Sequence, residues 1–118
     1  MKKIFLLTSL GISTGALFAQ SQRLVFVEEF TQASCGPCAS ANPAFNALLS
    51  ANTTKAVSVK YQVSWPGVDP MNAQNPPEVA TRVSYYGVSG VPDAYMDGNI
   101  YAGGAPSGIT QASINSEY

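Results

Sequence analysis

The stretch from Glu28 to Cys38 reads Glu-Glu-Phe-Thr-Gln-Ala-Ser-Cys-Gly-Pro-Cys, and it holds both cysteines of the 118-residue chain. A run rich in β-branched and aromatic residues, 24–30, precedes the cysteines, and a run typical of a helix, 39–50, follows them. Two thiols placed where a strand turns into a helix are typical of proteins that exchange thiols and disulfides. The sequence therefore predicts a functional site at this turn.

The segments around the cysteines predict the start of an α/β domain. Residues 24–30 are apolar on both alternating faces, which suits a central strand covered on both sides. A helix is expected over 39–50, with a kink at Pro43, and a second strand over 56–63. A strand, a helix and a strand in this order predict a parallel pair joined by a right-handed crossover.

The loop and the helix that follow carry clear boundary signals. Residues 65–75 are rich in turn-forming residues and predict a surface loop. Asn75 is expected to cap a helix, with Pro76 in the first turn and Glu78 as partner in a capping box. The helix should end before Gly87, because glycine adopts the left-handed conformation that follows many helices.

A hairpin and a last helix complete the predicted domain. The Asp-Gly pair at 97–98 lies between strand-like runs at 94–96 and 99–101, which is a strong signal of a two-residue hairpin. A last helix is expected over 108–116, with Ser107 as its cap. Together the elements predict a mixed sheet of about four strands with helices on both faces.

The first residues have the layout of an export signal. A positive end with two lysines precedes an apolar run over 4–18, and Ala19 offers a small residue for cleavage. That run is shorter than the roughly 20 residues a membrane-spanning helix needs. We expect a signal peptide over 1–19 and a single domain over 20–118. The product is expected in the periplasm or secreted, with no stable membrane insertion after cleavage; an association with the outer membrane stays open.

The charge of the chain argues against some classes of partner. It has 6 basic and 7 acidic residues, and two of the basic ones lie in the expected signal peptide. The remaining charges are few and scattered, whereas nucleic-acid and lipid-surface binding need a concentrated basic patch. We therefore expect no nucleic-acid partner.

Several kinds of chemistry compete for the two cysteines. A structural zinc site needs four ligands, and this chain has no histidine and no third cysteine. Covalent haem attachment needs a histidine directly after the second cysteine, where Ala39 stands. An inert structural disulfide would close so short a loop that it constrains the unfolded chain very little. A redox-active pair with no metal and no bound cofactor is the favoured interpretation.

The position at a helix start assigns a role to each thiol. Unpaired backbone N–H groups and the helix dipole stabilise a thiolate at the N-terminus of a helix. Cys35 is therefore expected to be the exposed nucleophile. Cys38, one turn further and more buried, is expected to resolve the mixed disulfide, while Gly36 and Pro37 set how easily the short ring closes.

These motifs resemble the thioredoxin-like superfamily. The Cys-Gly-Pro-Cys sequence at 35–38 is that of the thioredoxin active site, and Pro43 matches the helix proline of the family. The pair Val91-Pro92 looks like its cis-proline bend. The resemblance covers residues 24–104 and is strongest to exported thioredoxin-like domains of Gram-negative bacteria with Glu-Glu-Phe-Thr ahead of Cys-x-x-Cys. Some of those belong to a family named for outer-membrane proteins.

The resemblance implies roles for further residues. Glu29 falls where thioredoxins carry a buried acid, and it would accept the proton of Cys38; a carboxyl in an apolar strand should have a raised pKa. Glu28 points to the opposite face and is expected at the surface or against a helix. Pro92 would be cis and lie beside Cys35, leaving the backbone of the preceding residue free to pair with an extended substrate. The substrate-binding residues implied are Gly36, Pro37, Val91 and Pro92.

The chain also departs from the family pattern. Ser34 stands in place of the usual tryptophan before the first cysteine, and Ala39 in place of the usual lysine after the second. The strand and helix that open a full thioredoxin are missing ahead of residue 24. The expected fold is therefore a reduced core, either minimal or the front of a longer protein.

Two functional classes remain open at this stage. The favoured one is an exported thiol–disulfide oxidoreductase that acts on protein thiols or disulfides together with an unknown redox partner. The alternative is a non-catalytic binding or cell-surface module with the same fold and an idle disulfide. The direction of electron flow is also open, because Gly-Pro between the cysteines resembles reducing thioredoxins whereas the periplasm oxidises thiols.

Overall fold

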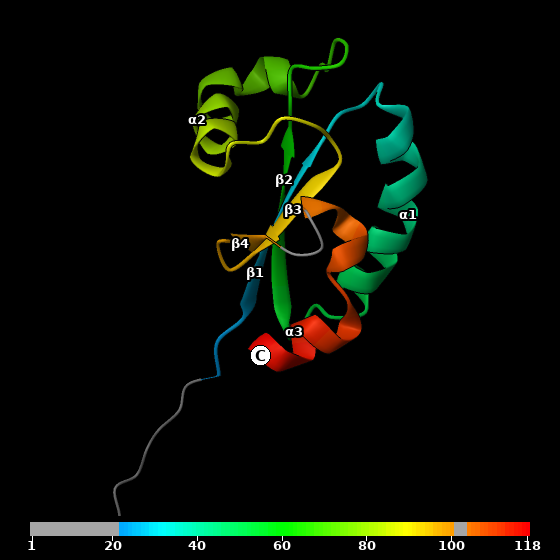
Figure 1. Ribbon diagram of the computed structural model, residues 1–118, viewed down its shortest axis with the longest axis vertical. Helices are drawn as coiled ribbons and strands as arrows, with labels where there is room; N and C mark the ends of the chain where they lie inside the picture. Colours follow the sequence, from blue (N-terminus) through cyan, green and yellow to red (C-terminus); the bar gives the residue numbers. More distant parts are fainter. Residues whose placement is uncertain (1–21, 101–103) are drawn as a thin grey trace, which may run out of the picture.

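The computed structural model describes residues 22–100 and 104–118 (Figure 1). The expected signal peptide over 1–19 and the end of the second hairpin arm, Tyr101, lie outside the described residues. Within those two ranges, no helix is long and apolar enough to cross a membrane.

Strands and helices alternate in the first half of the domain, and a hairpin and a short helix follow (Figure 1). Within the described residues, 3₁₀ turns are formed by η1 (Asn72–Gln74) and η3 (Pro106–Gly108). The strands and α-helices are β1 (Val25–Thr31), α1 (Gly36–Ser50), β2 (Ala56–Gln62), α2 (Pro76–Tyr86), β3 (Asp93–Met96), β4 (Asn99–Ile100) and α3 (Gln111–Glu117).

The sheet has the order β2-β1-β3-β4, with β1 in its interior. β1 pairs with β2 in parallel and with β3 antiparallel, so the sheet is mixed. In the described part of the chain, β4 covers Asn99–Ile100 and lies at the edge of the sheet beside β3. The prediction of an α/β domain with a mixed sheet and a parallel first pair is confirmed.

Each face of the sheet has its own hydrophobic core. α1 and α3 cover one face and α2 the other (Figure 1). Because side chains alternate along a strand, β1 supplies Val27 to the α1 side, where it packs with Phe45, and Phe30 to the α2 side, where it packs with Val79 and Tyr95. β1 is apolar on both faces because helices cover the sheet on both sides.

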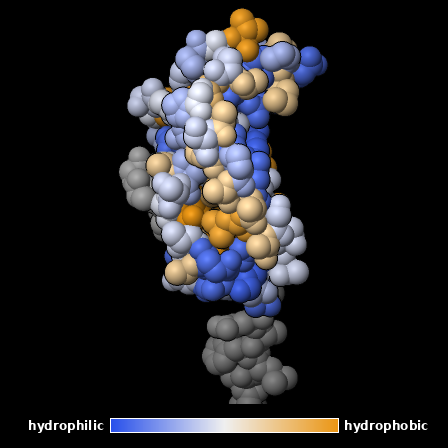
Figure 2. All heavy atoms as spheres, turned by 90° about the vertical axis from the view of Figure 1, so that its right-hand side faces the viewer, coloured by the Kyte–Doolittle hydropathy of each residue, from blue (hydrophilic) through white to orange (hydrophobic). Residues whose placement is uncertain are grey.

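The face that α1 covers also carries a shallow apolar groove. Figure 2 looks onto this side and shows hydrophobic side chains gathered low on it, flanked by hydrophilic ones. The groove has a volume of about 210 Å³ and lies between α1 and η3. Its lining residues are Ala41, Ala44, Phe45, Leu48, Pro106, Ser107 and Ile109.

The helix α1 begins at Gly36, earlier than the expected residue 39. Cys35 is the N-cap, since its Sγ accepts a hydrogen bond from the backbone N–H of Cys38 at 3.1 Å. Pro37 fits the first turn, where no backbone N–H has a partner within the helix. Pro43 lies inside the helix, as expected. The cysteines therefore form the start of the helix and do not merely precede it.

The capping of the two other helices differs from the expectation. Asn75 is the N-cap of α2 and Pro76 lies in its first turn, as predicted, but the Asn75 side chain makes no capping hydrogen bond, so the predicted capping box with Glu78 is wrong. Gly87 ends α2 with φ 65°, as predicted. The last helix is capped by Thr110, and its capping box with the third helical residue replaces the predicted cap Ser107, which lies in η3.

Candidate active site

The two cysteines form a disulfide at the N-terminus of α1, the cyan end of that helix in Figure 1. Their Cα atoms lie 5.2 Å apart. The backbone N–H of Cys38 points at the Sγ of Cys35 over 3.1 Å. A donor in this position favours a negatively charged sulfur at Cys35 when the disulfide opens.

Both sulfur-bearing residues are buried in this disulfide form. Cys35 is 3% exposed and Cys38 is 1% exposed, so the prediction that Cys35 is exposed is wrong here. The carbonyl oxygen of Val91 lies 3.6 Å from the Sγ of Cys35 and covers it. Gly36 and Pro37, by contrast, are exposed and form the surface next to the disulfide.

The bend at Val91 and Pro92 lies beside the disulfide, as the family resemblance implies. The peptide bond between these two residues is cis. The bend precedes β3 directly, and β3 pairs with β1, the strand that leads into the cysteine turn. The sheet therefore brings together two segments that lie more than fifty positions apart in the sequence. Pairing of the Val91 backbone with a substrate remains a prediction.

Glu29 is fully buried on the α1 side of the sheet. It lies opposite Lys60 in the parallel register of β1 and β2, and the lysine ammonium forms an ion pair with its carboxylate. Burial raises the pKa of Glu29, and the contact with Lys60 offsets only part of that rise. The expected buried acid with a raised pKa is thus present.

Asn42 connects Glu29 to the helical turn of Cys38. One end of its side-chain amide lies 2.7 Å from Glu29 Oε1 and 3.1 Å from the carbonyl oxygen of Cys38, and the other end lies 3.0 Å from Thr31 Oγ1. A carboxylate and a carbonyl only accept hydrogen bonds, so the amide nitrogen belongs at the first end. Glu29 therefore receives donors at both oxygens.

Two of these contacts were not found from the sequence. Asn42 follows Cys38 by one helical turn, a spacing that puts both on the same side of α1 and is visible in the sequence. Lys60 was assigned only to a strand, because its partner depends on the register between two strands. A parallel pairing of residues 25 and 56 would have been needed to place it.

A cavity of about 230 Å³ lies beside the disulfide on the side of Asn42 and Lys60. It offers space for polar groups next to Cys35, because amide side chains form much of its wall. Its lining residues are Thr31, Gln32, Ala33, Cys35, Ala39, Asn42, Asn46, Lys60, Gln62 and Met71.

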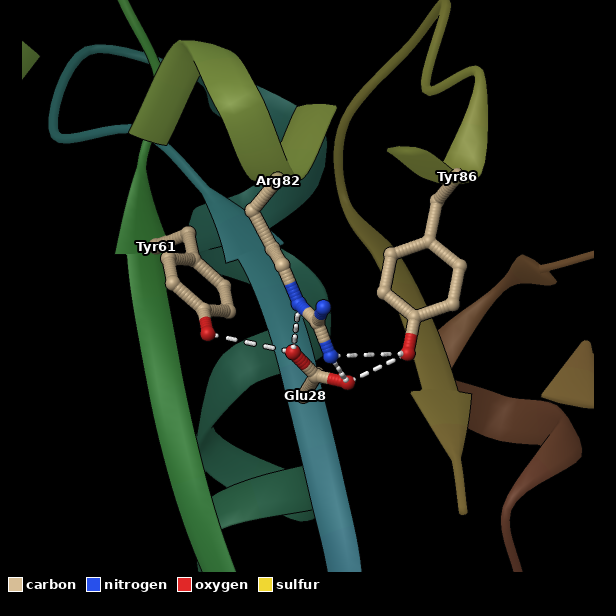
Figure 3. Close-up of polar contacts among 4 residues, drawn as sticks. All are labelled: Glu28, Tyr61, Arg82 and Tyr86. Atoms are coloured by element: carbon tan, nitrogen blue, oxygen red, sulfur yellow. Dashed lines mark hydrogen bonds and ion pairs between the residues drawn. The ribbon is translucent and has the colours of Figure 1, made fainter. Parts of the chain in front are cut away.

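Glu28 occupies an equally buried position on the opposite face of β1 (Figure 3). Arg82 donates from Nε to one carboxylate oxygen and from Nη2 to the other, and the hydroxyls of Tyr61 and Tyr86 donate as well. Burial raises the pKa of Glu28, but the combined hydrogen bonds outweigh burial and leave this pKa lowered. A surface position for Glu28 is wrong, and its expected position against a helix is confirmed.

The site so assembled consists of the disulfide, the cis bend and the acid Glu29. Within residues 22–100 and 104–118, no group of three or more His, Cys, Asp or Glu side chains is placed to hold a metal ion. No protein-family model matches the chain, and no curated protein matches it. Its function must therefore be argued from the chemistry of these residues.

Proposed function

We propose that this chain is a thiol–disulfide oxidoreductase with a thioredoxin-like fold. The observation that carries the proposal is the position of the disulfide. Cys35 caps α1 and receives a backbone N–H, and the amide of Asn42 joins the turn of Cys38 to the buried carboxyl of Glu29. A thiolate stabiliser and a proton acceptor beside one dithiol are the parts that disulfide exchange needs.

The thioredoxin-like fold is supported by the order of the elements. A strand, a helix and a parallel strand are followed by a helix, a cis-proline bend and an antiparallel hairpin. The disulfide lies at the start of the first helix, and Pro43 lies within that helix. This order agrees with the resemblance found in the sequence, and within residues 22–100 and 104–118 the first element is β1.

In the reducing direction, the thiolate of Cys35 attacks one sulfur of a substrate disulfide. A bond forms between Cys35 Sγ and that sulfur, and the other substrate sulfur leaves as a thiolate and takes a proton from water. Cys38 then attacks Cys35 Sγ, the Cys35–Cys38 disulfide forms, and the second substrate thiol is released. The substrate gains two electrons and two protons, and the protein must be reduced again by a dithiol donor.

Glu29 acts in the second of these steps. The thiol of Cys38 is a nucleophile only after it loses its proton. A buried carboxylate with a raised pKa accepts that proton near neutral pH and returns it to the departing substrate sulfur. In the oxidising direction the same steps run in reverse: a substrate thiolate attacks Cys35, and Cys38 leaves and takes the proton from Glu29.

Insulin-disulfide reduction tests the proposal. The wild type should catalyse the reduction by dithiothreitol, Cys35→Ser should have no activity above background, and Cys38→Ser should accumulate a mixed disulfide with the substrate. The rate and the trapped complex are both measurable, by turbidity and by non-reducing electrophoresis. A wild type that is no faster than dithiothreitol alone would contradict the proposal.

The second candidate is a binding module with an idle disulfide. It is favoured by one observation, the burial of both cysteines in this form. The reduction potential of the pair separates the two candidates, because a structural disulfide resists reduction and has a low potential. A potential below that of dithiothreitol, together with no insulin reduction, would favour the module.

The proposed location is outside the cytoplasm, in the periplasm or secreted. It rests on the signal-like layout of residues 1–19 and on the persistence of disulfides in oxidising compartments. The proposed partners are protein thiols or disulfides and a redox partner of unknown identity.

A further inference from the structure

Glu28 and the side chains that donate to it form a cluster on the face of the sheet away from Glu29, and the proposed reaction does not use it (Figure 3). This Glu28 cluster consists of Glu28, Tyr61, Arg82 and Tyr86. Four donor contacts converge on this carboxylate from two elements. Tyr61 comes from β2, and Arg82 and Tyr86 come from α2. The cluster therefore attaches α2 to the centre of the sheet through directional contacts.

The attachment point on α2 is close in sequence to the substrate-binding bend. Tyr86 is the last residue of α2, and Gly87 turns the chain out of the helix. The backbone N–H of Val88 still bonds to the carbonyl oxygen of Val83 at 3.0 Å. The segment that carries Val91 therefore starts from a fixed helix end.

The other end of this segment is held by the same group of side chains. The ring of Tyr95 stacks on that of Tyr86, with centroids 3.9 Å apart and planes at 23°. The hydroxyl of Tyr95 lies 3.5 Å from the carbonyl oxygen of Tyr86 and 2.9 Å from Asp93 Oδ2. Since Asp93 follows Pro92, residues 87–92 are anchored before and after the bend.

We propose that Glu28, Arg82 and Tyr86 are positioning residues for the redox site. Through the end of α2 they hold the Val91–Pro92 bend against Cys35, with the Val91 carbonyl oxygen 3.6 Å from Sγ. They thereby fix the position of the bend at which an extended polypeptide substrate would bind. This inference rests on the proposed oxidoreductase function and adds that side chains on the opposite face of the sheet position the substrate-binding bend.

Directional contacts suit this task better than apolar packing. An arginine fork on a carboxylate defines orientation as well as distance, because two parallel N–H···O bonds form only in one plane. Apolar side chains of similar size would bury α2 equally well and often cost less than a buried ion pair. What the charged cluster adds is a defined rotation of α2 about its own axis.

The test compares a protein disulfide with a small one. An extended polypeptide uses the bend, whereas a small aromatic disulfide such as 5,5′-dithiobis(2-nitrobenzoic acid) needs only the sulfurs. Tyr86→Phe removes one hydroxyl from the cluster and should raise KM for insulin about fivefold, as expected for one lost hydrogen bond, with kcat within about twofold. The rate with the small disulfide should stay at the wild-type value.

Further variants separate positioning from folding. Arg82→Met should raise KM for insulin more than Tyr86→Phe does, and Arg82→Lys, which keeps the charge without the fork, should restore part of the loss. Tyr85→Phe is the matched control, since Tyr85 lies next to Tyr86 and is 69% exposed. Near-UV circular dichroism reports whether each variant is folded.

The outcomes have distinct meanings. An active wild type with unchanged KM in folded Tyr86→Phe and Arg82→Lys would overturn this inference alone. Equal losses with the protein and the small disulfide would also overturn it, because they would indicate a general loss of structure. A wild type inactive toward insulin would overturn the proposed function and this inference together.

Discussion

Glu28 and Glu29 are neighbours in sequence and almost equally buried, with exposed fractions of 1% and 0%. They point to opposite faces of β1 and meet different surroundings. Glu28 receives an arginine fork and two tyrosine hydroxyls, whereas Glu29 has one lysine and the amide of Asn42. Burial raises the pKa of both carboxyls, but only Glu28 has enough donors to end with a lowered pKa.

The comparison shows that burial alone does not decide what a carboxyl can do. A carboxylate whose hydrogen-bonding positions are filled is a fixed anion and serves as an anchor. A buried carboxyl with fewer donors stays closer to its neutral form and exchanges protons more readily. Glu28 fits the first description and Glu29 the second, although one peptide bond separates them.

Replacing each carboxyl by an amide should show the difference between Glu28 and Glu29 most strongly in the free energy of unfolding. Glu28→Gln should destabilise the domain by about 3 kcal/mol, because it leaves the Arg82 guanidinium without its anion. Since the Arg82 side chain is 33% exposed, water can solvate part of its charge. The destabilisation should therefore lie at the low end of the range for removing one partner of a buried ion pair. Urea unfolding at pH 7 measures the difference. The matched control, Glu29→Gln, should cost less than about 1 kcal/mol.

The two carboxyls should also contribute to stability with opposite dependence on pH. The lowered pKa of Glu28 adds stability above its ordinary value of 4.5, and this is lost as pH falls through the folded pKa. The raised pKa of Glu29 has the opposite sign: its contribution is present below 4.5 and is lost as pH rises through the folded pKa. Glu28→Gln should therefore flatten the acid side of the profile, and a profile unchanged in both variants would contradict the assignment.

For the rate of disulfide exchange we expect the opposite order: Glu29→Gln should have the larger effect and Glu28→Gln the smaller one. Glu29→Gln should slow the resolution of the mixed disulfide by at least about tenfold near pH 7, because the thiol of Cys38 loses its proton acceptor. Rapid-mixing measurements of the second exchange step give this rate directly. The attack by Cys35, which precedes it, should keep its wild-type rate. Equal rates of resolution in Glu29→Gln and wild type would remove Glu29 from the mechanism.

The smallest expected effect concerns Asn42. Asn42→Ala removes the amide donor from Glu29 Oε1, so the pKa of Glu29 should rise further and the pH profile of resolution should move to higher pH. The cost in stability should be about 1 kcal/mol. Asn46→Ala, in the same helix and cavity wall, is the matched control. A profile that moves equally in both variants would argue against a specific contact.

Much of the backbone arrangement was predictable from local signals. The apolar run of β1 indicated a strand with two covered faces, and Gly87 indicated the end of α2. The buried acid at Glu29 and the cis bond before Pro92 followed from the family resemblance. Asn75 is the N-cap of α2 as predicted, although its side chain makes no capping hydrogen bond. The cap of α3 was assigned wrongly, because several polar residues near that helix start compete for one role.

The partners of the charged groups were not predictable in the same way. Lys60 reaches Glu29 only because residues 25 and 56 stand opposite each other in the parallel pair. Arg82 reaches Glu28 only because α2 packs over the upper part of the sheet. Both contacts join segments more than thirty positions apart, and the sequence of either segment alone does not indicate which residue its charged side chain contacts.

The amino-acid sequence by itself determined the elements, the dithiol at a helix start and the carboxyls that face opposite ways from one strand. These follow from side-chain periodicity and from the special backbones of proline and glycine, which act within a few residues. Only the tertiary structure decided that one carboxyl is a fixed anion and its neighbour is suited to proton exchange. The physical reason is that a pKa depends on which distant donors the packed elements bring within hydrogen-bond range.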